Sequence, residues 1–159
     1  MDKSSSQKLA PSIIGVWRWS SAAGYAFLYG LPVAYYSIFG SRDVHLWLLL
    51  ALSILCLAVW IIVVFIIPPI RWKRWRYSIN QNEIDLLRGV IVRKETLIPL
   101  SRVQHVDTRQ GPLLRWFNLS SVTISTAATT HEIPGLDEVI ADRVRREIST
   151  YARLAEEDV

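Results

Sequence analysis

Cysteine is nearly absent from this chain of 159 residues, which contains only Cys56. An intramolecular disulfide is therefore excluded, and the cysteine content gives no reason to expect an oxidising compartment. Charged residues are absent from one long stretch: Leu46 to Ile67 is 22 consecutive residues without Asp, Glu, Lys or Arg. An apolar helix of that length covers the hydrocarbon core of a bilayer, which is about 30 Å thick. The sequence therefore predicts a membrane protein.

Another uncharged stretch, Trp19 to Ser41, lies earlier in the chain. Glycine and proline interrupt it, but both are tolerated in spanning helices when neighbouring groups satisfy the freed backbone. Downstream, Pro68 and Pro69 are expected to stop the helix, because proline lacks an amide donor and clashes with the preceding turn. We predict two spans, at about 19–41 and 46–68, in a transmembrane hairpin over residues 18–70.

A cleaved signal peptide is the competing interpretation of the stretch from Trp19 to Ser41, since Lys3 and Lys8 precede it. However, its apolar region is longer than the core of a signal peptide, about 7 to 15 residues, and begins late, near residue 19. These two mismatches favour a retained membrane span.

The connection between the two predicted spans is short, at Gly40 to His45, so both chain ends are expected on one side of the membrane. Cations gather on that side, with Arg42 alone in the connection and the others at Lys3, Lys8, Arg18, Arg71, Lys73, Arg74 and Arg76. The positive-inside rule therefore places both termini in the cytoplasm. Residues 1–17 are then a cytoplasmic tail and residues 71–159 a cytosolic domain.

Basic charge is concentrated where the chain leaves the predicted hairpin. Residues 71 to 115 hold ten Lys and Arg against four Asp and Glu, whereas residues 116 to 159 hold four against eight. Cations interleaved with tryptophan suit the headgroup boundary of an anionic leaflet. The predicted membrane-surface residues are Arg71, Trp72, Lys73, Arg74, Trp75 and Arg76. Nucleic acid is not a predicted partner, because membrane topology already explains this segment.

Beyond Trp75 the pattern changes to short segments with period-two alternation and turn residues between them. The expected strands are 76–79, 83–86, 90–100 with a bend near 93–95, 102–110, 121–126 and 131–136. A short helix is expected over Leu113 to Phe117, with Asn118 as a left-handed stop. After Asp137, a candidate N-cap, one apolar helix face is expected from Ile140, Val144, Ile148, Tyr151 and Ala155.

This order predicts an α+β fold: an antiparallel split β-barrel of about six or seven strands capped by one C-terminal helix. Several short motifs lie at fixed places in it, namely Arg76-Tyr77, Leu87 to Gly89, Ile98 to Gln104 with Asp107, Gln110-Gly111 and Gly135 to Asp137. With them the chain resembles the bacterial PH-domain family of YdbS-like membrane proteins, over nearly its whole length apart from the N-terminal tail. The resemblance implies a PH-like domain behind a two-helix hairpin in the bacterial cytoplasmic (inner) membrane. Asn118 stands where such proteins often carry glycine, and asparagine tolerates the same left-handed geometry.

No catalytic constellation is apparent. Ser101 and His105 would lie four residues apart on a strand, about 13 Å, too far for a nucleophile to reach a base, and Asp107 cannot complete a triad without that contact. His45, His105 and His131 lack the spacing of metal ligands, and no glycine-rich phosphate loop follows a strand. We therefore predict no enzyme activity, no metal site and no cofactor.

Binding is the remaining class of function. Arg93, Lys94, Arg102 and Arg109 are predicted to converge with Arg74 and Arg76 on a basic surface for a ligand or partner; ordinary solvated strand residues are the competing explanation. The leading hypothesis is a non-enzymatic membrane protein whose PH-like domain binds a protein partner in the same membrane or copies of itself, through strand edges that can accept another strand. The alternative is sensing of anionic lipid headgroups or envelope stress through the basic surface.

Overall fold

The computed structural model describes residues 6–40 and 46–157. The chain divides into two compact units, a helical unit, Trp17–Pro69, and a domain formed by residues up to Val16 together with those from Ile70 onward. The predicted connection with Arg42 and His45, and also Lys3, lies outside the described residues.

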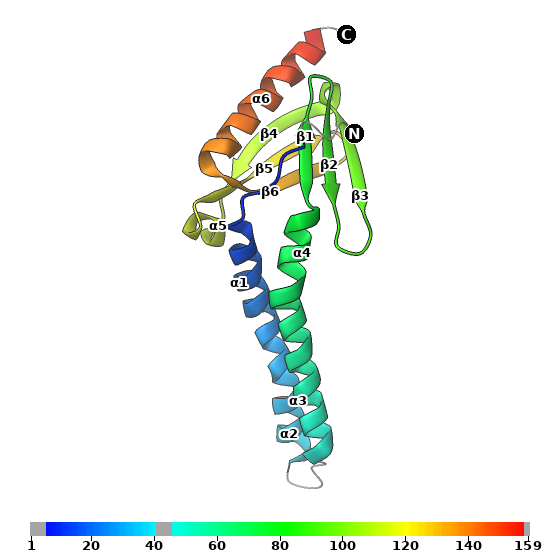
Figure 1. The fold of residues 1–159 in the computed structure, drawn as a ribbon, viewed down its shortest axis with the longest axis vertical. Helices are drawn as coiled ribbons and strands as arrows, with labels where there is room; N and C mark the ends of the chain where they lie inside the picture. The colour runs from blue at the N-terminus through cyan, green and yellow to red at the C-terminus, as the bar shows by residue number, and fades with distance from the viewer. Residues whose placement is uncertain (1–5, 41–45, 158–159) are drawn as a thin grey trace. The chain divides into compact units, whose positions relative to one another are not determined.

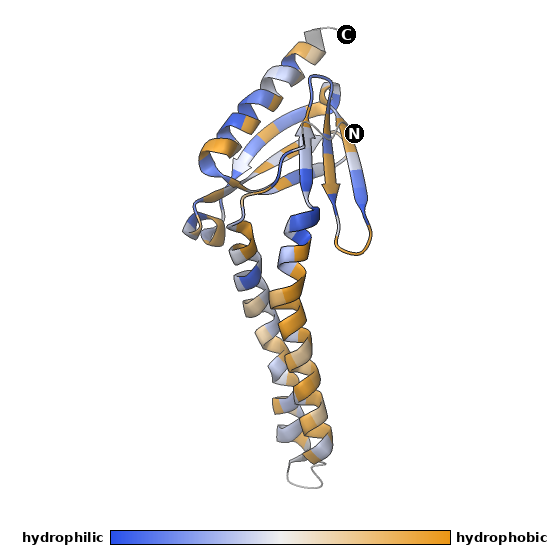
Figure 2. Ribbon diagram, viewed as in Figure 1, coloured by the Kyte–Doolittle hydropathy of each residue, from blue (hydrophilic) through white to orange (hydrophobic). Residues whose placement is uncertain are grey.

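The helical unit and the helices that enter it are built from six helical segments (Figure 1), namely α1 (Ile13–Ala26), the 3₁₀ turn η1 (Phe27–Tyr29), α2 (Gly30–Phe39), α3 (Leu46–Ile61), the π-helix η2 (Ile62–Ile66) and α4 (Ile67–Arg74). Helix α2 packs against α3. Figure 2 shows α3 as predominantly apolar, and most of its large side chains are exposed. Within the described residues, Leu46–Arg74 is the one continuous helix with the length and composition to cross a membrane. The two-span hairpin stays a prediction.

Pro68 and Pro69 do not end this helix, which continues to Arg74. The predicted stop at Pro68 is therefore wrong. The reason is the π-helical segment immediately upstream, where the Ile67 N–H bonds to the Ile62 carbonyl, five residues back. A π-turn changes the hydrogen-bond register of a helix, and here it does so just ahead of two residues that have no N–H to donate. The place where the membrane boundary crosses this helix stays a prediction.

Cys56 donates a hydrogen bond to a backbone carbonyl in the uncharged stretch from Trp19 to Ser41. Pro32 has no N–H, so it cannot donate to the carbonyl of Leu28, four residues earlier. The buried Cys56 thiol of α3 lies 3.7 Å from that carbonyl oxygen and donates to it. A neighbouring helix thus supplies the donor that proline removes, which is how proline is tolerated in an apolar environment.

The domain contains two three-stranded antiparallel sheets in the described residues, with strand orders β1-β2-β3 and β4-β5-β6 (Figure 1). Their bounds are β1 (Arg76–Ile79), β2 (Glu83–Arg88), β3 (Lys94–Pro99), β4 (Val103–Arg109), β5 (Leu119–Thr126) and β6 (Thr130–Asp137). The remaining elements are the 3₁₀ turn η3 (Leu100–Arg102) between β3 and β4, α5 (Pro112–Trp116) and the C-terminal α6 (Glu138–Glu157). Six strands and a C-terminal helix agree with the predicted α+β class, and closure into a split barrel stays a prediction.

Two local predictions need correction. The β-branched segment from Val90 is a turn, and β3 begins only at Lys94. Gly89 before it has φ 127°, which turns the chain out of β2. In α6 the buried face is Ala141, Val144 and Ile148, whereas Ile140 is 36% exposed. The left-handed stop at Asn118 is confirmed, with φ 53°.

The N-terminal segment is part of the domain core, which corrects the predicted separation of a tail, residues 1–17, from the domain. The side chains of Leu9 and Ile13 are each 1% exposed. Gln7 exchanges backbone hydrogen bonds with Tyr77 of β1, at 2.7 and 3.1 Å, and the Ala10 N–H donates to the Gly135 carbonyl of β6 at 3.0 Å. The segment therefore ties the first strand of one sheet to the last strand of the other, and a domain taken as residues 71–159 lacks it.

Candidate binding surfaces

A cluster of cations lies between the last turn of α4 and the β2–β3 hairpin. Arg71, Arg88 and Lys94 line a hollow of about 280 Å³ together with Trp75, Gly89 and Val90. Arg88 and Lys94 are directly opposite each other in the β2–β3 register. Like charges directly opposite on a sheet destabilise it, and a bound anion would relieve the repulsion. We call this site the basic hollow.

Hydrogen bonds fix the α4 side of the basic hollow. The Arg74 guanidinium donates to the Val90 carbonyl, and the Trp72 indole N–H donates to the Leu9 carbonyl at 2.9 Å. The Lys8 ammonium lies 5.9 Å from the Trp72 ring centroid. Trp75, predicted at the membrane surface, is 2% exposed and belongs to the domain core instead. The residues of the predicted membrane-surface group that stay exposed are Arg71, Lys73 and Arg74.

The predicted basic surface is only partly assembled. Lys94 joins Arg71 in the basic hollow, and Arg93 is exposed at the end of the β2–β3 turn. Arg102 and Arg109 line two other hollows, and the one at Arg109 also contains the acids Glu138 and Asp142. Arg88 is not among the predicted residues, although its place directly before the turn glycine, across a hairpin from Lys94, is a signal for it.

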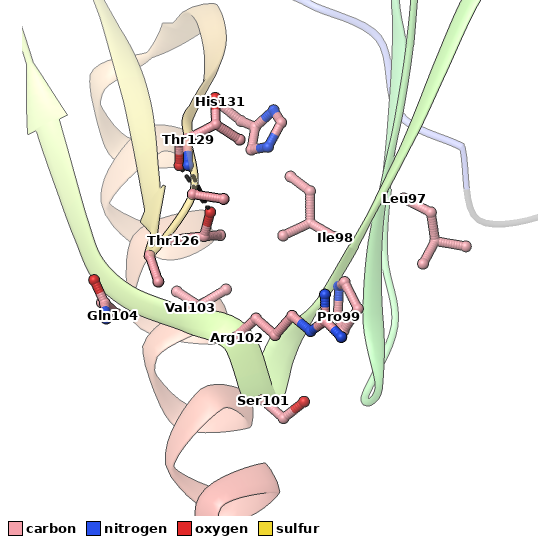
Figure 3. A pocket seen from close by; sticks show the side chains of 12 residues that line it. Leu97, Ile98, Pro99, Ser101, Arg102, Val103, Gln104, Thr126, Thr129 and His131 are labelled. Carbon is pink, nitrogen blue, oxygen red and sulfur yellow. Dashed lines mark hydrogen bonds between the residues drawn. The ribbon is translucent and has the colours of Figure 1, made fainter.

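Arg102 lines a cleft of about 650 Å³ between β3, the start of β4 and the β5–β6 turn (Figure 3). Its walls are mostly apolar, and Figure 3 shows Ile98, Thr126 and His131 around it. The Thr126 hydroxyl donates to the Thr129 carbonyl at 2.8 Å, so the turn is held in place. Burial lowers the pKa of His131, and the nearby charges of Arg88 and Lys94 lower it further. The cations that line the basic hollow thus add to the effect of burial on the pKa of His131.

A fourth hollow, of about 330 Å³, is a groove between strand β4 and helix α6. Strand β4 is the edge of its sheet, and among the described residues no strand pairs with its outer side. Its side chains are mostly exposed, including Gln104, His105 and Asp107, and Ser149, Ala152 and Arg153 of α6 form the facing wall. We call this the edge groove. An unpaired edge strand presents a row of backbone donors and acceptors to any extended segment.

The residues weighed for a catalytic triad line different hollows. Ser101 lines the cleft at Arg102 while His105 lines the edge groove, so the two are not brought together as a nucleophile and base. Within residues 6–40 and 46–157, no group of three or more His, Cys, Asp or Glu side chains could hold a metal ion.

Comparisons with known proteins agree on one family. A family model described as bacterial PH domain matches residues 26–152. The chain is 52% identical over 106 residues to the UPF0699 transmembrane protein YdbS of Bacillus subtilis (strain 168), which covers 64% of this chain and 67% of that protein. It is 26% identical over 102 residues to the UPF0699 transmembrane protein YdbT of the same organism, covering 62% of this chain and 20% of that protein. No solved structure matches the chain.

Proposed function

Because this chain belongs to the bacterial PH-domain family, as the resemblance to YdbS-like membrane proteins implied, we propose that it is a non-enzymatic membrane protein whose PH-like domain binds other proteins. In this proposal a two-span hairpin crosses the bacterial inner membrane, both termini are cytoplasmic, and the two sheets form the halves of a split barrel. The partner is a protein in the same membrane or a second copy of this chain.

The edge groove is the observation that carries this proposal. A peptide that adds to an edge strand gains main-chain hydrogen bonds, while pockets beside the strand select its side chains. Strand β4 offers the exposed edge, and Ala152 and Ser149 of α6 offer the adjacent wall. Both polar and charged side chains, His105, Asp107 and Arg153, border the groove and give it the means to discriminate among partners. The proposed ligand is therefore an extended segment that lies along β4.

We expect a photo-crosslinker placed at His105 in the full chain, expressed in its membrane, to form protein adducts that depend on an open edge groove. Ala152→Arg puts a long, charged side chain into the groove and should abolish the adducts. Thr150→Arg introduces the same side chain on the exposed side of α6, outside the groove lining, and should leave them intact. Gel shifts and mass spectrometry of the adducts measure both effects and separate self-association from a different partner.

Adducts that persist in the Ala152→Arg variant, or a His105 probe that captures no protein, would contradict the proposal. The full chain is required, because residues 71–159 alone lack Leu9 and Ile13 of the domain core.

Recognition of anionic lipid headgroups is a second candidate function, favoured by the opposed cations Arg88 and Lys94 beside Arg71. We expect the purified full chain in detergent to retain phosphatidylglycerol in a salt-sensitive manner, since the cations attract phosphate. Replacing Arg88 and Lys94 together by alanine should weaken retention, whereas Arg109→Ala should not. If only Lys73 and Arg74 mattered in the same assay, the lipid would be a general anchor of the chain and not a ligand of the domain.

A further inference from the structure

The turn between β2 and β3 presents two large aliphatic side chains to solvent. Ile91 is 92% exposed and Val92 is 77% exposed, the highest exposures of any Ile or Val side chain in the part of the chain that the structure describes. Turns of this kind are normally built from glycine, asparagine, aspartate and serine, because their backbone geometry and solvation suit those residues. Figure 2 shows this turn as an apolar tip that protrudes beyond the strands. Its composition is therefore unlike that of a solvated hairpin turn.

The turn is held in a defined shape. Gly89 has φ 127°, and a Cβ atom there would collide with the Val92 carbonyl oxygen, so the chain doubles back tightly at this point. The Arg74 side chain donates to the Val90 carbonyl and fastens the turn to the last turn of α4. Ile91 and Val92 are thus held outward by the fold and have no core of their own to pack into.

Cations bracket the aliphatic tip on both sides. In sequence it lies between Arg88 and Arg93-Lys94. Val90, directly before it, lines the basic hollow with Arg71, and its carbonyl accepts a hydrogen bond from Arg74. An apolar tip flanked by basic residues suits the boundary between headgroups and acyl chains, where the tip enters the apolar layer and the cations meet phosphate.

The position of the turn along α4 fits the same boundary. The uncharged part of the candidate spanning helix ends at Ile70, and Arg74 lies four residues further on, a rise of about 6 Å. Each headgroup layer of a bilayer is of similar thickness, about 5–8 Å. With the boundary at the end of the uncharged stretch, the hydrogen bond from Arg74 keeps Val90, which precedes the tip, near the depth of the headgroups.

We propose that the β2–β3 turn is a membrane anchor, in which Ile91 and Val92 insert into the interface of the bilayer that the chain itself crosses while Arg88, Arg93 and Lys94 contact lipid phosphate. This goes beyond both proposed functions, because neither the edge groove nor headgroup recognition in the basic hollow requires aliphatic insertion. The anchor fixes the domain to the membrane surface at a second point besides the covalent connection through α4.

The test uses the full chain in nanodiscs of phosphatidylglycerol and phosphatidylethanolamine, at one copy per disc. An environment-sensitive fluorophore is attached at Ile91→Cys in a Cys56→Ala background, and the matched control is the exposed Gln81→Cys in the β1–β2 turn at the other end of the same hairpin ladder. We expect the probe at 91 to be quenched by lipid-borne nitroxides and protected from aqueous iodide, with the reverse at 81. Burial of one such aliphatic side chain favours insertion roughly ten-fold or more, so protection should be nearly complete.

A second variant keeps the proposal falsifiable if the labels disturb the turn. Ile91→Asn with Val92→Asn changes only exposed side chains and should leave the domain folded, while a probe at Arg93→Cys loses its lipid quenching. Val139→Asn, which also replaces an exposed aliphatic residue but on α6, should leave that quenching unchanged. Equal iodide access at positions 91 and 81 would overturn the proposal. Protection that appears only when several copies share a disc would overturn it as well, and would assign the tip to a protein contact.

Discussion

Replacing Leu9 and Ile13 together by alanine is expected to unfold the domain while the helical unit keeps its structure. Each side chain is 1% exposed, and truncating a buried Leu or Ile to Ala costs about 2–5 kcal/mol. The sum approaches or exceeds the whole stability of a typical small domain, about 5–15 kcal/mol. The segment also joins β1 to β6 through Gln7 and Ala10, so its loss should release both sheets. Hydrogen–deuterium exchange of the full chain in detergent, read separately for β1, β6 and α3, measures this.

The matched control for that variant is Leu154→Ala on α6, since Leu154 is 52% exposed. A surface truncation away from special features changes stability by less than about 0.5 kcal/mol. Native exchange protection of Tyr77 and Gly135 in the double variant would show that the N-terminal segment does not stabilise the domain.

The parts of the fold that were predictable are those whose signal is local. Uncharged length indicates the long helix, period-two alternation indicates the strands, and the left-handed preference of asparagine explains Asn118. The N-terminal segment has no such signal, because its partners, Tyr77 and Gly135, lie far away along the sequence. Pairing over that distance leaves no periodic trace in a short tail.

The wrong predictions at residues 90–92 and at Pro68 share a cause. In both places the structure of neighbouring residues outweighs the intrinsic preference of the residues themselves for a strand or a helix end. The β-branched residues at 90–92 favour a strand by propensity, yet the positive φ of Gly89 makes them a turn. Pro68 and Pro69 favour a helix end, yet the π-helical register before them lets the helix continue. In both places the deciding feature is a backbone geometry that residue composition alone does not specify.

The binding surfaces were less predictable than the fold. Charge counting found the basic segment, but could not distinguish the core residue Trp75 from its exposed neighbours, nor separate Arg102 and Arg109 from Lys94. Those distinctions depend on which strands pair and on their register, which places Arg88 directly opposite Lys94. The edge groove depends on the path of α6 along β4, which the amphipathic pattern of the helix does not reveal.

Gly135→Ala is expected to destabilise the domain by about 2–4 kcal/mol, through backbone strain and overpacking at one position. Gly135 has φ +61°, which an L-residue with a side chain adopts only at a cost. A Cβ there would also lie 2.7 Å from the Ile13 Cβ and 2.4 Å from its Cγ1 and Cδ1. Since the Gly135 carbonyl accepts the Ala10 N–H, relief of the clash requires the N-terminal segment to move away from β6. The midpoint of thermal unfolding in detergent should therefore fall by roughly 5–20 °C.

Gly111→Ala is the control for this substitution, because Gly111 has φ −77° and open space around its Cβ direction. There the same change should be neutral or slightly stabilising, since alanine reduces the freedom of the unfolded chain by about 0.4–1 kcal/mol. Combining Gly135→Ala with Ile13→Ala separates the two causes, because alanine removes the Cγ1 and Cδ1 atoms that lie nearest the added Cβ. If the clash with Ile13 dominates, the double variant loses less stability than the sum of the two single variants, and if backbone strain dominates, the two effects add. Equal unfolding midpoints for the Gly135→Ala and Gly111→Ala variants would contradict the close approach of the N-terminal segment to β6.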